Sequence, residues 1–305
     1  MSIKVNNITK LYGKQKALDN VSFEIKTGEI TGFLGPNGAG KSTMMKIITG
    51  FLPANSGNVF VNDINVNENP LEVKKIIGYL PENNPLYLDM YVKEYLQFVA
   101  SIHLNKKEIK QKVKNIIDLT GLGIEQNKKI SSLSKGYRQR TGLAQALIHN
   151  PDILILDEPT TGLDPNQIVD IRNLIIEIGK EKTIMLSTHI MQEVEAICNK
   201  VIIIDKGKIV ADDSSKKIQD KIIDNKTVVI IEFDKRIEKA LLEKIEGVEN
   251  LINHKENTWL IESKNNIDIR ASLFNFAVKN NLTVLSLQKQ EKSLEDVFKI
   301  LTGNN

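Results

Sequence analysis

Cysteine is almost absent from this chain of 305 residues, in which Cys198 is the only one. No disulfide can form within the chain, which fits a reducing compartment, and we expect Cys198 to be a buried or half-buried structural thiol. Neither sign of charge is in clear excess, because 41 lysine and arginine residues face 38 aspartate and glutamate residues, for a formal net charge of +3. This balance gives no reason to expect a nucleic acid as the main partner.

Long apolar runs are also missing. The runs at residues 153–156 and 201–204 are among the longest, and they fall far short of the roughly 18 residues that cross a bilayer. The N-terminal sequence MSIKVNNITK has neither the apolar core nor the cleavage site of a signal peptide. We therefore interpret the apolar runs as buried strands, and we expect any link to a membrane to be made through a partner.

One glycine-rich segment, GPNGAGKS at residues 35–42, matches the pattern G-x-x-x-x-G-K-[ST] in full. Its glycines let the backbone turn tightly and point successive N–H groups at an anion. Lys41 supplies a positive charge for the outer phosphates of a nucleotide, and the Ser42 hydroxyl is placed to ligate Mg²⁺. The residues before position 35 predict a strand, and those from Thr43 onward predict a helix whose N-terminus faces the phosphates.

Two acidic residues, Asp157 and Glu158, follow the predicted strand at 153–156. An ordinary turn at a strand end would also explain such a pair, but a phosphate-binding loop in the same chain favours a catalytic role. We expect Asp157 to hold Mg²⁺ through water and Glu158 to orient or deprotonate the attacking water. Strands that alternate with helices indicate an α/β fold with a largely parallel core sheet.

With these motifs in place, the chain resembles the ATP-binding subunit of ABC transporters. Four further segments carry the resemblance in the family's order: the Q-loop YLPE at 79–82, the signature motif LSKGY at 133–137, the D-loop GLD at 162–164 and the switch histidine His189. The resemblance covers residues 2–211. It implies an α/β P-loop NTPase cassette, with a mixed core sheet and a helical subdomain, that binds and hydrolyses ATP with Mg²⁺.

The resemblance also implies roles for the matching residues. Glu158 and His189 are the catalytic pair, with His189 in contact with the γ-phosphate, and Mg²⁺ is held by Ser42, Glu82 and Asp157. The nucleotide-binding residues are Tyr12, Gly35, Pro36, Asn37, Gly38, Ala39, Gly40, Lys41, Ser42, Thr43, Ser134, Gly136 and Asp164.

Two of these assignments need comment. Tyr12 would stack on the adenine, and ordinary packing explains this aromatic residue equally well. Ser134 and Gly136 would contact the γ-phosphate held by an opposing subunit. The resemblance therefore implies that two copies of the chain close head to tail around two ATP molecules.

Two motifs depart from the family pattern. The signature has Lys135 for Gly and Tyr137 for Gln, and the Q-loop has Glu82 where Gln is usual. Lys135 either helps to bind an anion or is solvated, and Glu82 can still ligate Mg²⁺. Both departures, and the segment SLEDVF at 293–298, resemble ABC-2 exporters with separately encoded membrane subunits. Within that branch the chain looks most like gliding-motility-associated ATP-binding proteins, with drug, lipid or polysaccharide exporters as near relatives.

This resemblance predicts the partners. We expect a polytopic membrane permease that docks on residues 86–95, a second copy of the chain, and no nucleic acid. The chain would then lie on the cytoplasmic side of the inner membrane, held there by the permease. The alternative is a soluble, non-transport ABC ATPase that acts on ribosomes or DNA. The single cassette and the near-neutral charge argue against it.

The polar stretch at 212–225 predicts a boundary between a cassette at 1–213, with a helical subdomain at about 89–150, and a domain at 226–305. The second part shows the order β-α-β-β-α-β of a ferredoxin-like fold, and we expect it to regulate or stabilise the dimer. Its expected core consists of Val229, Ile231, Leu241, Ile245, Leu260, Leu273, Phe276 and Leu285, with Trp259 also in the core.

The coarse prediction within the cassette places helices at 91–102, 106–120, 137–149 and 189–199. A further helix starts at Asp164-Pro165, where Asp is the N-cap, and is expected to end at Gly179. Residues 53–80 are expected to hold only strands and turns.

Overall fold

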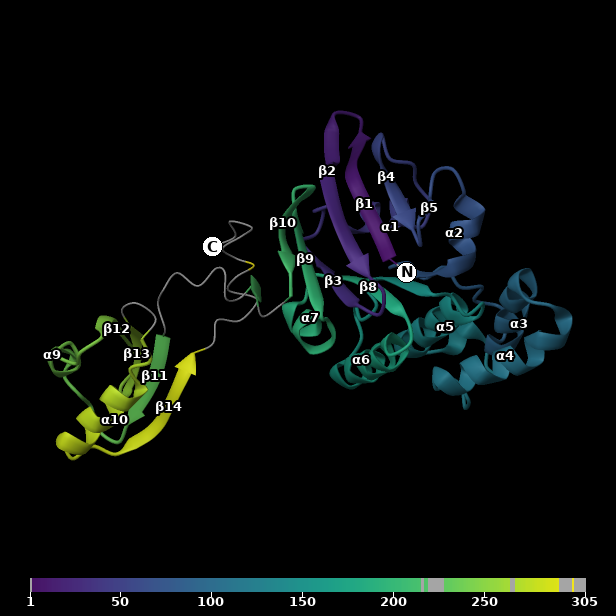
Figure 1. The fold of residues 1–305 in the computed structure, drawn as a ribbon. Helices are drawn as coiled ribbons and strands as arrows, with labels where there is room; N and C mark the ends of the chain where they lie inside the picture. Colours follow the sequence, from purple (N-terminus) through teal and green to yellow (C-terminus); the bar gives the residue numbers. More distant parts are fainter. Residues whose placement is uncertain (1, 215–216, 219–227, 264–266, 291–297, 299–305) are drawn as a thin grey trace. The chain divides into compact units, whose positions relative to one another are not determined.

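A computed structural model describes residues 2–214, 217–218, 228–263, 267–290 and 298 (Figure 1). The chain divides into two compact units, residues 1–215 and 216–305, which we describe separately. The predicted segment 293–298 and the linker 212–225 lie mostly outside the described residues.

A six-stranded sheet with the strand order β10-β9-β3-β8-β7-β6 forms the centre of the first unit. Its strands are β3 (Ile30–Leu34), β6 (Ile77–Leu80), β7 (Ile153–Asp157), β8 (Thr183–Thr188), β9 (Lys200–Asp205) and β10 (Lys208–Asp213). All neighbours are parallel except the β9–β10 pair. Every residue of β3, β7 and β8 is buried, as expected for parallel strands that are covered on both faces.

One face of this sheet shares a core with an antiparallel sheet of order β2-β1-β4-β5. Its strands are β1 (Ser2–Tyr12), β2 (Gln15–Lys26), β4 (Ser56–Val61) and β5 (Ile64–Asn65). Met44 and Ile48 of helix α1 (Lys41–Ile48) belong to the same core as Ile155 of β7. The period of two in the strand places Leu154 and Leu156 in the core on the opposite face.

That opposite face is covered by helices. They are α3 (Val92–His103), α4 (Lys106–Leu119), α5 (Lys135–Leu147), α6 (Pro165–Gly179) and α7 (Met191–Ile197), with the 3₁₀ turn η1 (Ile130–Ser132) before α5 (Figure 1). The predicted helices at 91–102 and 106–120 agree with α3 and α4 within about one residue. The α/β cassette fold with a mixed sheet and a helical segment is therefore confirmed.

Two local predictions were wrong. Residues 53–80 contain a helix, α2 (Pro70–Ile76), whose start is marked by Asn69 and Pro70. Helix α6, in contrast, ends at Gly179 as predicted. A β-carbon at Gly179 would clash with the Ile30 side chain. Helix α7 is shorter than 189–199, and Cys198 is its half-buried C-cap.

The second unit has the element order β11 (Val228–Phe233), α9 (Lys239–Leu242), β12 (Val248–Lys255), β13 (Thr258–Ser263), α10 (Arg270–Lys279) and β14 (Val284–Gln290). The sheet is antiparallel, with the order β12-β13-β11-β14, which is the arrangement of a ferredoxin-like fold. Trp259 is buried in its core as expected. Leu241 and Leu285 are 41% and 59% exposed, so their assignment to the core was wrong. Helix α9 turns only once, and β14 bulges next to Leu285, which explains the shifted faces.

Candidate active site

The glycine-rich loop joins β3 to α1, as its sequence predicts, and two glycines are required by its backbone. Gly40 has a φ of 110°, and a β-carbon there would lie 2.6 Å from the Ala17 carbonyl oxygen. Gly35 has no room for a side chain either, because its β-carbon would lie 2.5 Å from the Ile204 carbonyl oxygen. The loop therefore keeps its curved path, and the N-terminus of α1 remains open to an anion.

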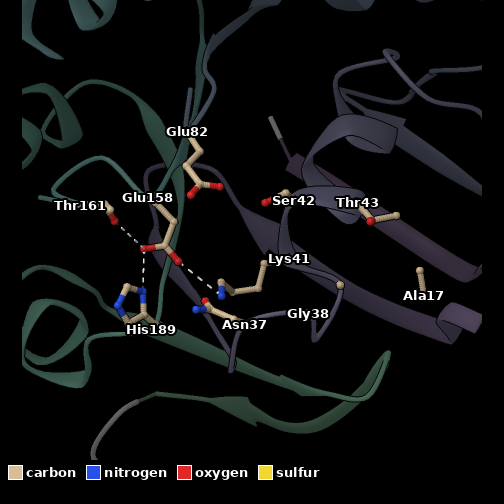
Figure 2. Close-up of a pocket in the computed structure, with 11 residues that line it drawn as sticks. Ala17, Asn37, Gly38, Lys41, Ser42, Thr43, Glu82, Glu158, Thr161 and His189 are labelled. Carbon is tan, nitrogen blue, oxygen red and sulfur yellow. Dashed lines mark hydrogen bonds and ion pairs between the residues drawn. The ribbon is translucent and has the colours of Figure 1, made fainter. Parts of the chain in front are cut away.

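Lys41 is the first residue of α1, and its side chain is 6% exposed. It donates a hydrogen bond to the Gly35 carbonyl oxygen at 2.8 Å and lies 3.3 Å from the Glu158 carboxylate. Buried charges are stable only when they are paired, and here the two charges compensate each other. Figure 2 shows both side chains in the same cavity.

Glu158 follows β7 and has a φ of 51°, which is uncommon for a residue other than glycine. One carboxylate oxygen faces Lys41, and the other lies 2.9 Å from His189 Nδ1 and accepts from the Thr161 hydroxyl at 3.1 Å. The Glu158 N–H donates to the Ser187 hydroxyl at 3.0 Å. The strained backbone is thus held by contacts on both the side chain and the amide.

Asp157, at the end of β7, is 2% exposed and accepts from the Ser42 hydroxyl at 3.2 Å and from the Ser187 hydroxyl at 2.6 Å. Hydroxyl and carboxylate oxygens are ligands that suit Mg²⁺. Among the residues that the structure describes, no group of three or more His, Cys, Asp or Glu side chains forms a metal cluster. These residues fit a Mg²⁺ ion that shares its coordination with phosphate and water.

These residues surround a cavity of about 370 Å³ (Figure 2). It is lined by Ala17, Asn37, Gly38, Gly40, Lys41, Ser42, Thr43, Glu82, Glu158, Thr161 and His189. The structure therefore brings together six of the nine predicted loop residues, both predicted catalytic residues and Glu82. The charges and exposed backbone N–H groups make this cavity suitable for the phosphates of a nucleotide.

Gly35, Pro36 and Ala39 of the loop and the predicted metal ligand Asp157 do not line this cavity, and neither do the four predicted binding residues from other segments. Tyr12 lies at the end of β1, is 50% exposed, and has the Lys10 ammonium 5.7 Å from its ring centroid. Ser134 is the N-cap of α5, and Asp164 caps α6 by accepting from the Gln167 N–H at 2.9 Å. Gly136 faces this Gln167 side chain, which would lie 2.7 Å from a β-carbon at that position.

Lys135 and the Q-loop contact the surrounding segments. The Lys135 ammonium would lie 2.0 Å from a β-carbon at Gly162, so it reaches the predicted D-loop. Two residues after the Q-loop, Asn84 donates from its side chain to the Arg138 carbonyl oxygen of α5 at 2.9 Å. Its amide also fills the space above Gly142, where a β-carbon would lie 2.3 Å from Asn84 Oδ1. Lys135 is thus in contact with protein as well as with solvent.

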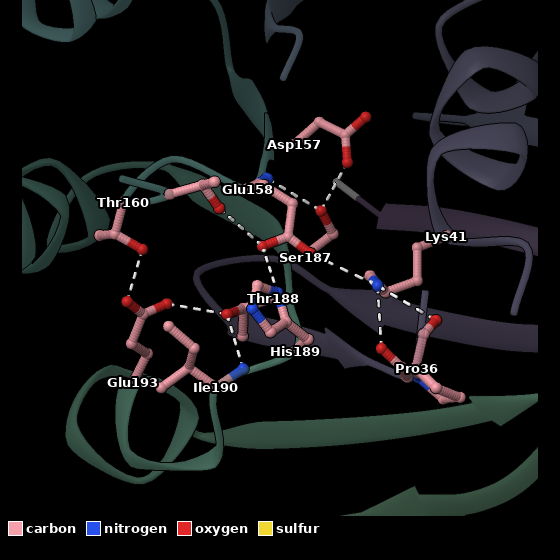
Figure 3. A network of polar contacts seen from close by, with 12 residues as sticks. Pro36, Lys41, Asp157, Glu158, Thr160, Ser187, Thr188, His189, Ile190 and Glu193 are labelled. Atoms are coloured by element: carbon pink, nitrogen blue, oxygen red, sulfur yellow. Dashed lines mark hydrogen bonds and ion pairs between the residues drawn. The ribbon is translucent and has the colours of Figure 1, made fainter. Parts of the chain in front are cut away.

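Neither Ser187 nor Thr161 of this site was predicted from the sequence. Ser187 contacts Asp157 and Glu158, and Thr161 contacts Glu158 (Figure 3). Both have a sequence signal, since Ser187 ends the strand before His189 and Thr161 follows the acidic pair by three residues. Because parallel strands end at one edge of the sheet, hydroxyls there are candidates for the site.

The fold, the glycine-rich loop and the acidic pair at a strand end define a P-loop ATPase. A family model described as "ABC transporter" matches residues 18–161. The bacitracin transport ATP-binding protein BcrA of Bacillus licheniformis is 34% identical over 99% of this chain and 97% of its own length. The linearmycin resistance ATP-binding protein LnrL of Bacillus subtilis (strain 168) is 33% identical over 99% and 98%. The chain therefore belongs to the ATP-binding subunits of ABC transporters.

Solved structures agree with this assignment. A dimeric, post-hydrolysis structure of the ATP-binding cassette MJ0796 bound to ADP and Pi has a TM-score of 0.64 and 26% sequence identity. The similarity covers 70% of this chain and 98% of the MJ0796 chain. The predicted ATPase activity is confirmed at the level of this family. In the part of the chain that the structure describes, no helix is both long enough and apolar enough to cross a membrane.

Proposed function

We propose that this ATPase subunit powers an exporter as a head-to-tail pair, through a separate membrane permease. The observation that carries the proposal is the division of the predicted nucleotide contacts. The loop residues and Glu158 line one cavity, whereas Ser134 and Gly136 lie outside it, at the start of α5. The N-terminus of α5 is a second place where backbone N–H groups can receive an anion. Two copies would bring the two half-sites together.

The proposed roles follow from the contacts. ATP would supply the scissile phosphate, and a bound Mg²⁺ ion would supply positive charge to neutralise it. Ser42, Asp157 and Glu82 would hold the ion, and Lys41 would bind the outer phosphates. Once Lys41 binds phosphate, one oxygen of Glu158 loses its present ion pair and can accept a proton from water. His189 then keeps the other carboxylate oxygen in position.

The assembly can be tested by light scattering on the Glu158→Gln variant, which should bind ATP without turning it over. We expect it to be mainly monomeric without nucleotide and dimeric with ATP and Mg²⁺. The Ser134→Ala change in the same background should weaken the dimer. An unchanged mass with saturating ATP would contradict the composite site.

The proposal that transport is outward is supported by the names of the relatives. Their names refer to bacitracin transport and linearmycin resistance, and the similarity extends over 99% of this chain, including the second unit. We propose that the transported compound is of this kind, an antibiotic that the cell removes. A role in gliding motility stays a prediction from the signature and Q-loop sequences. Expression with the permease should raise the inhibitory concentration of such a compound, and Glu158→Gln should abolish the increase.

The permease is proposed to dock on residues 86–95, which would hold the chain on the cytoplasmic face of the inner membrane. Tyr87, Leu88 and Tyr91 of this segment are 56%, 47% and 47% exposed. Phe98 and Ile102 of the adjacent α3 are also exposed. Co-purification in detergent should recover a polytopic membrane protein and lose it with Tyr91→Asp. Recovery of ribosomes or DNA instead would support the non-transport alternative.

We also propose that the cassette ends near residue 213 and that the unit from 226 onward regulates or stabilises the pair. The support is that the described nucleotide-site residues all come before position 190, whereas the second unit has a core of its own. A chain that ends at Asp213 should still bind ATP but change its hydrolysis rate or its transport. A folded truncation without ATP binding would contradict this division, and one identical in all three assays would contradict the regulatory role.

A further inference from the structure

A buried carboxylate outside the nucleotide cavity connects the two segments that carry Glu158 and His189. It belongs to Glu193 of α7, which is 1% exposed. One of its oxygens accepts from the Thr160 hydroxyl at 2.5 Å, and the other accepts from the Thr188 hydroxyl at 2.8 Å (Figure 3). Thr160 and Thr188 are 2% and 0% exposed, so water does not compete for these hydrogen bonds.

Each threonine lies beside a residue of the active site. Thr160 directly precedes Thr161, whose hydroxyl donates to the Glu158 carboxylate. Thr188 directly precedes His189, and its oxygen accepts from the Ile190 N–H at 3.0 Å, so it holds the backbone on both sides of the histidine. Glu193 therefore joins the loop after β7 to the end of β8.

We infer that Glu193 is a positioning residue for ATP hydrolysis: it fixes the distance between Glu158 and His189 without touching the nucleotide. This inference depends on the proposed roles of Glu158 and His189. The Glu158 backbone lies in a sparsely populated region and needs contacts that hold it there. Without the carboxylate, two buried hydroxyls would lose their acceptor, and the loops would move to satisfy them.

The test compares Glu193→Gln and Glu193→Ala in the full chain, with Gln192→Ala on the exposed side of the same helix as the control. Because the amide keeps one acceptor oxygen, we expect kcat to fall about tenfold in Glu193→Gln and about 100-fold in Glu193→Ala. Small displacements of catalytic groups cause losses of this size. The Kd for ADP, measured by calorimetry, should stay within about twofold because the glycine-rich loop is not touched. The control should equal the wild type.

A double-mutant cycle separates positioning from simple support of the fold. If Glu193 acts through Glu158, adding Glu193→Gln to Glu158→Gln should cost nothing further in residual single-turnover hydrolysis. The inference would be overturned if the two changes lowered the hydrolysis rate independently, so that their effects multiplied in the double mutant. A wild-type kcat in Glu193→Gln would also overturn it, and so would an equal loss in kcat and in ADP binding. Wild-type hydrolysis by Glu158→Gln alone would instead contradict the proposed function, so the two failures are distinguishable.

Discussion

The two units bury different kinds of side chain. The cassette buries Lys41, Asp157, Glu158 and Glu193 in its interior, all of them less than 9% exposed. Among the described residues of the second unit, Ser263 is the only buried polar side chain, and the rest of the core is apolar. Buried charges cost free energy unless each is paired, whereas apolar burial stabilises directly. The cassette thus carries a cost in stability for its buried charges, whereas the core of the second unit consists of apolar side chains that stabilise it.

The largest expected effect tests whether the buried charges serve catalysis. Glu158→Gln should lower ATP hydrolysis about 1,000-fold, because an amide cannot accept the proton of the attacking water. ATP binding should persist in this variant and be lost in Lys41→Ala. The exposed Glu177→Gln is the matched control and should hydrolyse ATP at the wild-type rate. If Glu158→Gln hydrolysed ATP at the wild-type rate, the buried charges would not serve catalysis.

A second prediction concerns packing in the apolar unit. Trp259→Ala should destabilise that unit by about 3–5 kcal/mol, the usual cost of removing a large buried aromatic residue. Hydrogen exchange should then increase in β11 and β13 but not in β7, and ATP turnover by the cassette should change little. Trp259→Phe should cost much less, since the indole N–H has no hydrogen-bond partner among the described residues. The exposed Leu285→Ala change is the control.

The third prediction concerns pH and is confined to the cassette. Burial, with a smaller contribution from the adjacent His103 ring at a centroid distance of 4.6 Å, lowers the pKa of His149 from 6.5 to about 4. The folded cassette therefore binds fewer protons than the unfolded chain between these values. Its stability should be complete above pH 6.5 and should fall by about 2 kcal/mol as the pH drops toward 4, after allowance for partial exposure.

Urea unfolding between pH 8 and 5, followed by hydrogen exchange in each unit, measures this difference. His149→Gln should flatten the pH dependence of the cassette, because glutamine can still donate to the Ile77 carbonyl oxygen that His149 contacts at 3.1 Å. The second unit should show no such dependence in this variant series. Equal slopes for wild type and His149→Gln would contradict the assignment.

The smallest expected effect is that of Glu82→Gln. A carboxylate binds Mg²⁺ more strongly than an amide, so the variant should need about threefold more Mg²⁺ for half-maximal hydrolysis. Glu82 lines the cavity, but among the described contacts it forms no ion pair like the buried one between Glu158 and Lys41. An unchanged Mg²⁺ dependence would leave Glu82 only a role in coupling to the permease.

Most of the fold could be predicted because its signals are local. The period of two in β2 and the helical spacing in α3 and α4 each identify an element and its buried face. Helix α2 could not be recognised in the same way, because it has seven residues and a single buried one, Val73. Leu285 was assigned to the wrong face because a bulge in β14 shifts the alternation, and a bulge depends on the partner strand.

The site was predictable to the extent that its residues lie in motifs. The glycine-rich loop, the acidic pair and His189 come from separate strands, but the carboxyl ends of parallel strands meet at one edge. The contacts between them were not predictable. The pairing of Lys41 with Glu158, and the two hydroxyls bound by Glu193, depend on side-chain directions that no sequence pattern specifies.

The contact of Asn84 with α5 has a mechanical consequence. Asn84 follows the Q-loop, and its amide is fixed both to the Arg138 carbonyl oxygen and against Gly142, one turn further along the helix. Neither contact leaves space for sliding, because Gly142 is buried and its surface is filled by the amide. A displacement of the loop at 83–88 would therefore push or pull on α5 through Asn84. Ser134, at the N-terminus of α5, would shift with the helix. A force applied at the loop would then change the orientation of the signature motif.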